Sequence, residues 1–348
     1  MATKEKIVED RQAEAQPVVE PKPEAGWVDV KSEVARRLID AMEKGETPWQ
    51  KPWSSPAMQP KNPVTGNGYR GINRVLLSLA GGNGLWVTYQ QAQAQGWQVR
   101  KGEKGTMIVK VVDLDQQPKQ KGEAVAGDRG EKDKDYKRSG HRNVILRRYY
   151  VFGAHQIDGM PELEPTGALD FHPVERAESV IEAMKRETGL MIIHGGDRAC
   201  YVPALDEVRI PPKRAFKTEY DYYSTACHEI CHSTMHTKRL NRAEAYAKKW
   251  GDSAYGLEEL TAEIGAAILA SETGLASSEE LAAAHLEDHA KYLRGWIKAI
   301  ERDPMAIFTA AKNAEKISEY VLGLERQMTA LDPHKEWIEE YERAKGAR

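Results

Sequence analysis

The sequence predicts an α+β protein of two domains, a small N-terminal α+β domain followed by a mainly helical domain with a small sheet. The chain of 348 residues is long enough for two domains and a sizeable core. Short helical and extended patterns alternate in its first half, whereas the pattern is mostly helical from Leu257 onward. Charge divides in the same way, because residues 27–150 carry a net charge of +9 and residues 151–348 one of −10. The halves are therefore expected to have different tasks, and the basic half is the one suited to a polyanion.

Composition places the domain boundaries. Residues 1–26 are polar, charged and proline-bearing without periodicity, which is typical of a disordered tail. The first domain is expected to span residues 27–158, with a flexible excursion at 116–142 where the chain is charged and has no core pattern. Residues 159–168 are interpreted as a linker, and residues 169–348 as the second domain.

Capping and turn signals divide the first domain into short elements. Thr88 with Gln91 three residues later predicts a capping box, and the glycine-containing stretch 101–105 predicts a hairpin turn. The expected elements are helices from Asp29 to Gly45, from Asn73 to Ala80 and from Thr88 to Gly96, and strands at 97–100, 106–114 and 143–152.

The second domain begins with a helix that Pro173 opens and Gly189 ends. Thr218 and Asp221 predict another capping box, which starts a helix that extends toward His236. The remaining expected elements are short strands at 190–193, 199–203 and 207–210 and an apolar helix from Glu258 to near Ser271.

The helix that follows Thr218 contains the pentapeptide His228-Glu229-Ile230-Cys231-His232. Residues four apart share one helix face, so His228 and His232 can direct two imidazoles at one point. Zn²⁺ in a hydrolase takes two such nitrogens, a third protein ligand and water, and Glu229 is placed to remove a proton from that water. The pattern therefore predicts a metal site with Glu229 as general base. Two surface histidines on an ordinary helix are the alternative.

The third ligand must come from another part of the chain. His236 lies two turns beyond His228, about 12 Å along the helix, which is too far for one ion. Glu259 and Glu263 share a helix face downstream, while Leu260 and its apolar neighbours face the core. One of these carboxylates is expected to bind metal and the other to hold a ligand histidine. A solvated acidic face is the alternative reading of the pair.

Other features limit the environment of the protein. No apolar run approaches the length of a membrane span, and the N-terminus lacks an apolar signal segment, so we expect a soluble, cytoplasmic protein with no membrane partner. The three cysteines include no C-x-x-C pair. Cys227 and Cys231 lie on the metal-site helix and are interpreted as buried packing residues.

Aromatic residues alternate with cations through the first half. Trp49 and Trp53 lie in a proline-stiffened loop, and Tyr69 is adjacent to Arg70. Exposed rings stack on bases while Lys and Arg contact phosphates, a combination that binds single strands without a sequence code. The alternative is that the tryptophans, Trp86 among them, are core residues of a small domain.

Motifs in both halves resemble the ArdC-type antirestriction proteins of conjugative plasmids and phages. The resemblance extends from about residue 30 to residue 325. The residues that carry it are Pro48-Trp49-x-x-Pro52-Trp53, Asn62-Pro63-x-Thr65-Gly66-x-x-Tyr69-Arg70-Gly71-Ile72-Asn73, Trp86-x-Thr88-Tyr89-x-Gln91, Val99-Arg100-Lys101-Gly102-Glu103-Lys104-Gly105, His228 to His232, Glu258 to Glu263, and His289-Ala290-x-Tyr292-x-x-x-Trp296-Ile297.

The resemblance implies an N-terminal single-stranded-DNA-binding domain and a C-terminal zincin-like metallopeptidase domain. It implies a factor that accompanies incoming DNA and protects it from host restriction. It also implies Zn²⁺ bound by His228, His232 and a downstream glutamate, and by analogy with gluzincins Glu259 would be the ligand and Glu263 its neighbour in the second layer. His289 and Tyr292 are possible stabilisers of a hydrolytic transition state. The residues expected to contact DNA are Trp49, Trp53, Tyr69, Arg70, Asn73, Arg100, Lys101 and Lys104.

Two alternatives stay open at this point. In the first, the protein is a DNA-binding module whose metal only stabilises the second domain. In the second, it is a protease that is delivered with DNA and acts on a host protein. The ligand set also accepts divalent ions other than Zn²⁺.

Overall fold

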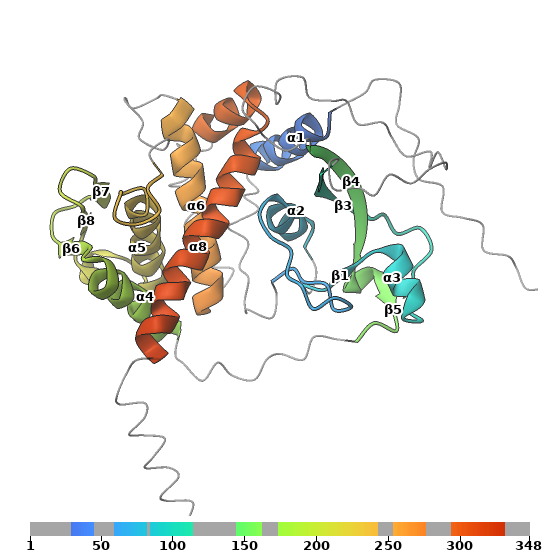
Figure 1. The fold of residues 1–348 in the computed structure, drawn as a ribbon, viewed down its shortest axis with the longest axis horizontal. Helices are drawn as coiled ribbons and strands as arrows, with labels where there is room; N and C mark the ends of the chain where they lie inside the picture. The colour runs from blue at the N-terminus through green and yellow to red at the C-terminus, as the bar shows by residue number, and fades with distance from the viewer. Residues whose placement is uncertain are drawn as a thin grey trace, which may run out of the picture.

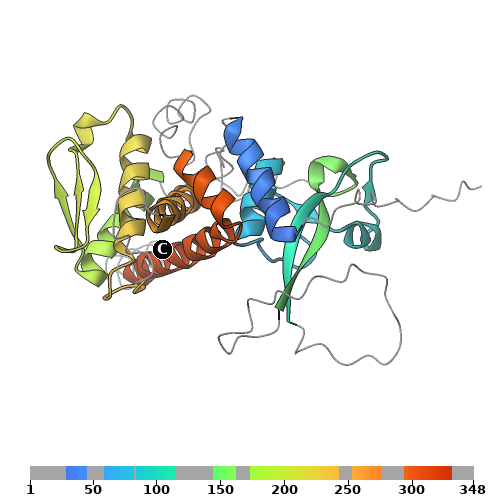
Figure 2. The same cartoon turned by 90° about the horizontal axis from the view of Figure 1, so that it is seen from above.

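The computed structural model describes residues 29–44, 59–81, 84–113, 144–161, 173–242, 253–275 and 294–330. Its elements form two halves that lie side by side, with α1, α2 and the β3–β4 ribbon in one half and α4, α5, α6 and α8 in the other (Figures 1 and 2). The architecture is mixed α+β, as the sequence predicted. Among the described residues, no helix is both long enough and apolar enough to cross a membrane.

The N-terminal half contains three helices and five strands among its described residues. Its sheets are β1-β4-β3 and the pair β2-β5, all antiparallel. Thr88 and Gln91 form the predicted capping box. The elements are α1 (Val30–Glu43), α2 (Ile72–Ala80), β1 (Trp86–Val87), α3 (Tyr89–Ala94), β2 (Gln98–Val99), β3 (Thr106–Asp113), β4 (Val144–Gly153), the 3-10 helix η3 (Ala154–Gln156) and β5 (Ile157–Asp158).

The predicted hairpin across residues 101–105 is wrong. β2 pairs with β5, and β3 pairs along its whole length with β4. The turn itself forms, with Gly102 at a φ of 90° and Glu103 N–H donating to Arg100 C=O at 3.2 Å. However, the Gln156 side chain donates to Glu103 and to the Lys104 carbonyl. These contacts with a distant segment divert the chain from a local hairpin.

The C-terminal half places four long helices beside a small sheet of order β6-β8-β7. β8 is parallel to β6 and antiparallel to β7. Residues 294–302 are also helical. The elements are α4 (Pro173–Thr188), β6 (Met191–His194), β7 (Cys200–Val202), β8 (Glu207–Ile210), the 3-10 helix η4 (Lys213–Ala215), α5 (Glu219–Ser233), α6 (Ser253–Thr273) and α8 (Ala306–Ala330).

One hydrophobic core is continuous between the halves. Val34, Leu38 and Met107 from the N-terminal half pack with Leu260 and Ile264 of α6 in a single buried cluster. Ion pairs join the same elements, because Arg74 of α2 lies 3.0 Å from Glu315 of α8 and 3.7 Å from Glu272 of α6. The face of α6 that was predicted to enter a core therefore enters one shared by both halves.

Candidate metal centre and nucleic-acid surface

Helix α5 is fixed at its start by a capping box and along its length by burial. The Thr218 hydroxyl accepts from Asp221 N–H at 3.1 Å, and the Asp221 carboxylate accepts from Thr218 N–H at 3.2 Å. Cys227 and Cys231 are fully buried in the core of this half, and burial raises the pKa of the Cys227 thiol to about 12. They are packing residues, as predicted, and His228 and His232, each one position further along, lie about 100° round the helix from them.

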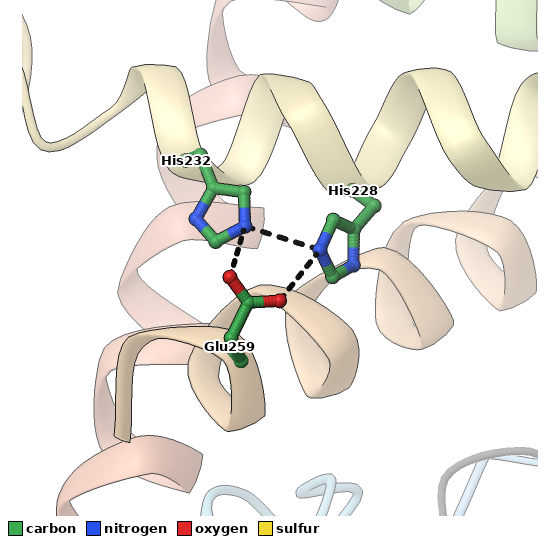
Figure 3. A group of neighbouring side chains, drawn as sticks. All are labelled: His228, His232 and Glu259. Carbon is green, nitrogen blue, oxygen red and sulfur yellow. Dashed lines mark hydrogen bonds and ion pairs between the residues drawn. The ribbon is translucent and has the colours of Figure 1, made fainter. Parts of the chain in front are cut away.

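His228, His232 and Glu259 converge on one point between α5 and α6 (Figure 3). The Nε2 atoms of the two histidines are 3.1 Å apart. The Glu259 carboxylate places Oε2 3.6 Å from His228 Nε2 and Oε1 3.6 Å from His232 Nε2. All three side chains are largely buried, with exposed fractions of 21%, 11% and 11%.

Two further glutamates hold the outer nitrogen of each imidazole. Glu263 Oε2 lies 3.3 Å from His228 Nδ1, and Glu258 Oε1 lies 3.1 Å from His232 Nδ1. Such partners fix the ring orientation and the tautomer, so that each Nε2 offers its lone pair to the centre. Glu263 therefore lies where the sequence analysis placed the second-layer carboxylate.

Glu258 is a residue whose role the sequence analysis missed. Arg242 holds its carboxylate through two nitrogens, at 2.5 and 2.8 Å, and also donates to the Cys231 carbonyl at 3.0 Å. Three acids within six residues were visible in the sequence. Which histidine nitrogen each acid contacts depends on how α6 packs against α5. No local sequence pattern determines that packing.

The donor atoms fit a divalent metal ion. One atom from each of the three side chains lies within 4.8 Å of the others. Ligand bonds of about 2.0–2.2 Å in a tetrahedral arrangement require donors about 3.3–3.6 Å apart. The two Nε2 atoms are 3.1 Å apart, and each lies 3.6 Å from a different oxygen of the Glu259 carboxylate, so the donors are within the range that one ion spans after small side-chain rotations. Imidazole with carboxylate is a donor set for Zn²⁺ and similar cations.

The electrostatics of the cluster also favour a cation. Burial opposes protonation of His228, but the carboxylates of Glu259 and Glu263 outweigh it and raise its pKa well above the usual range. Burial likewise opposes ionisation of Glu259, but the two histidines outweigh it and keep the pKa of its carboxyl below normal. The carboxylates thus attract positive charge to the point where the Nε2 atoms meet.

Glu229 lies on α5 directly after His228 and is 7% exposed. Its negative charge contributes to the raised pKa of His228. Among the described residues, no hydrogen-bond donor is paired with its carboxylate.

The other predicted residues of the metal site are accounted for separately. His289 and Tyr292 lie outside the described residues. His236 lies away from the centre, with its Nδ1 3.7 Å from the Asp206 carboxylate.

The residues predicted to contact DNA have diverse surroundings. The Tyr69 hydroxyl donates to the Trp86 carbonyl at 3.2 Å. Asn73 pairs with the backbone of Val109 through both its side-chain atoms, at 2.7 and 2.8 Å. Both side chains therefore hold the N-terminal half together, and Trp86 is fully buried as the packing alternative expected.

The arginines and lysines that were predicted to contact DNA also have different surroundings. Arg70 is paired with Glu319 of α8, and Arg100 lies 3.2 Å from Asp158 and 3.8 Å from Glu103. Lys101 and Lys104 are exposed. Trp49 and Trp53 lie outside the described residues.

Comparison with known proteins identifies both halves. The family model for the N-terminal domain of anti-restriction factor ArdC matches residues 28–152, and that for a zincin-like metallopeptidase matches residues 179–313. The metal-free crystal structure of antirestriction ArdC from plasmid R388 is similar over 86% of this chain and 99% of that chain, with a TM-score of 0.64 and 31% identity. The chain belongs to the ArdC family.

A second structure of the R388 ArdC protein, which holds Mn(II), is similar over 86% of this chain and 98% of that chain, with a TM-score of 0.61 and 31% identity. Two Escherichia coli proteins named DNA primase TraC are 39% and 40% identical over 84% and 85% of this chain. The chain spans only 20% and 27% of their lengths. The protein y4eC of Sinorhizobium fredii is 32% identical over 84% of this chain and 91% of its own.

Proposed function

We propose that this protein is an antirestriction factor that binds single-stranded DNA with its N-terminal half and hydrolyses peptide bonds at the metal centre of its C-terminal half. It would act in the cytoplasm on DNA that enters with a conjugative plasmid or phage. The observation that carries the enzymatic part is the triangle of His228, His232 and Glu259 donors, with each outer imidazole nitrogen held by another glutamate.

Each residue of the centre has a distinct task in this proposal. His228 and His232 would hold the ion through Nε2, and Glu259 would hold it through a carboxylate oxygen. Zn²⁺, or another divalent cation, supplies a Lewis acid that polarises a carbonyl group and makes water more acidic. The Glu229 carboxylate would accept a proton from water as the water oxygen bonds to the peptide carbonyl carbon, and it would return that proton to the amine nitrogen when the C–N bond breaks.

The identity of the metal is proposed on the donor set. Two imidazoles and one carboxylate suit Zn²⁺, and they also accept Mn²⁺. The Mn(II)-bound structure of the R388 relative supports a divalent ion in this family. A protein substrate from the host is the proposed partner of this centre.

The DNA-binding part rests on family membership and charge. Residues 28–152 match the N-terminal domain of ArdC, and residues 27–150 carry a net charge of +9. Phosphate contacts release counterions, so DNA affinity should fall steeply as salt is added. An affinity that does not change with salt would contradict this part.

Glu229→Gln tests the enzymatic part, because it removes the base and leaves the three donors in place. We expect metal content and DNA affinity to stay at wild-type levels while protection of incoming DNA and cleavage of the host substrate are lost. Protection at the wild-type level would show that proteolysis is not its cause and would favour a metal site that only stabilises the fold. Loss of one host protein in cells that express wild type but not the variant would identify the substrate.

A further inference from the structure

The two faces of the β3–β4 ribbon have different surroundings. Val109 pairs with Arg148, and both lie on the face that packs against α1, where Arg148 is 3.0 Å from Glu33. Residues alternate between faces along a strand. Lys110, Arg147 and Tyr149 therefore share the other face, which we name the Lys110 face.

Two cations lie directly opposite each other on the Lys110 face. Lys110 and Arg147 are cross-strand partners in the β3–β4 register, and both side chains are exposed. Like charges in this position destabilise a sheet unless an anion lies between them. Among the described residues, no carboxylate forms an ion pair with either cation.

Among the described residues of the N-terminal half, Lys61, Lys101 and Lys104 also form no ion pair, whereas four arginines do. Arg70, Arg74, Arg100 and Arg148 each lie within ion-pair distance of a glutamate or aspartate. Those arginines stabilise contacts within the protein. Among the described residues, Lys110 and Arg147 have the charge of such arginines without an ion-pair partner, and their exposed positions allow contact with an external anion.

An aromatic ring completes the Lys110 face. The Tyr149 side chain is 37% exposed, and the Lys110 Nζ atom lies 5.8 Å from the centroid of its ring. Tyr149 pairs across the ribbon with Ile108, which packs against the buried cluster of Leu77, Trp86 and Val151. The ring is therefore anchored at one side while the cations lie at the other.

We propose that the Lys110 face is the surface that holds single-stranded DNA, with Tyr149 stacking on a base and Lys110 and Arg147 contacting the neighbouring phosphates. This inference rests on the proposed function and gives it a site. A ring that stacks needs an unpaired base, and two adjacent exposed cations suit a closely spaced polyanion. A single strand supplies both, whereas a duplex hides its bases from a flat face.

The test measures binding of a short fluorescent oligodeoxythymidine to the full chain and to four variants over a range of salt concentrations. Tyr149→Ala should weaken binding about tenfold, within the range for loss of one stacked base. Lys110→Ala with Arg147→Ala should reduce the slope of log affinity against log salt by about 1.4, since each phosphate contact in a single strand contributes about 0.7. A duplex of equal length should bind more weakly and should not respond to Tyr149→Ala.

Matched variants control for fold and for charge. Tyr150→Ala removes the adjacent tyrosine, which is 39% exposed but lies on the opposite face, and it should leave binding unchanged. Lys312→Ala with Lys316→Ala removes two exposed cations of α8 and should leave the salt slope unchanged. Thermal unfolding of every variant checks that the fold is retained.

The outcomes separate this inference from the proposed function. If wild type fails to bind the oligonucleotide, the proposed DNA-binding function itself is wrong. If wild type binds and Tyr149→Ala binds equally well, or if Tyr150→Ala causes the larger loss, the Lys110 face is not the site. Equal sensitivity of single strand and duplex to Tyr149→Ala would also overturn it.

Discussion

The metal centre and the Lys110 face differ in how the fold brings their residues together. The centre uses two side chains four residues apart on α5 and acids from the next described helix, α6. The Lys110 face uses residues of β3 and β4 that meet only through cross-strand register. A metal ion demands strict geometry, which a helical repeat provides, whereas a polyanion accepts many arrangements. The first kind of site leaves a short sequence pattern and the second leaves mainly a charge balance.

The strongest test of the metal half of this comparison is His232→Ala. Loss of one of three ligands should weaken metal binding on the order of a thousandfold or more, as measured by metal content after dialysis and by calorimetric titration. His236→Ala is the matched control, since His236 lies by Asp206 and not at the centre. If His236→Ala loses as much metal as His232→Ala, the ion is not bound at the proposed centre.

A substitution in the shared core tests whether the two halves unfold as separate units. Met107 comes from the N-terminal half and is fully buried in the cluster that contains Leu260. Met107→Ala should lower the free energy of unfolding by about 2–5 kcal/mol and release metal in the same single transition. Met191 is 53% exposed, so Met191→Ala should change the free energy of unfolding by less than about 0.5 kcal/mol.

Two separate transitions in Met107→Ala, with metal retained through the first, would contradict a shared core. Calorimetry with simultaneous detection of metal release distinguishes the two cases.

Glu258→Gln tests the outer layer of the centre. The carboxylate holds His232 Nδ1 and is itself held by Arg242, so the substitution should weaken metal binding about 10- to 100-fold. Glu182→Gln, on the exposed surface of α4, is the control for the change of charge. Equal metal affinity in the two variants would show that Glu258 does not support metal binding.

The smallest expected effect is a pH dependence at Asp206. Burial opposes ionisation of Asp206, but Arg239 and Tyr201 outweigh it and lower the pKa of its carboxyl. A lowered pKa stabilises the fold at pH values above the unfolded-state pKa of about 3.9 and loses that contribution as pH falls through the folded-state pKa. Wild type should therefore exceed Asp206→Asn in stability at neutral pH, and the difference should shrink below about pH 4. A difference that stays constant down to pH 2 would contradict the assignment.

The helices of both halves were predictable because their signals are local. The capping boxes at Thr88 and Thr218 and the helix that Pro173 opens form as expected. Strand pairing was less predictable, since β2 joins β5 from more than fifty residues away. Capping depends on neighbours in sequence, whereas pairing depends on contacts that only the folded chain supplies.

The metal centre and the predicted DNA contacts also differ in whether local sequence signals were enough to predict them. The spacing of His228 and His232 and the shared face of Glu259 and Glu263 indicated that these side chains could meet, but they did not indicate which acid contacts which nitrogen or that Glu258 contacts His232. In the N-terminal half, Asn73 and Arg70 were predicted to contact DNA, yet their partners are Val109 and Glu319. Side-chain type indicates what a residue is able to bind, but distant contacts decide whether it is free to do so.

A crystal structure of the full chain grown with Zn²⁺ tests the central claim most directly. The account predicts one ion bound by His228 Nε2, His232 Nε2 and a Glu259 carboxylate oxygen, with Glu258 and Glu263 remaining on the outer imidazole nitrogens. An ion bound elsewhere, or Nε2 atoms of His228 and His232 that keep their contacts with each other and with Glu259 at saturating metal, would contradict it.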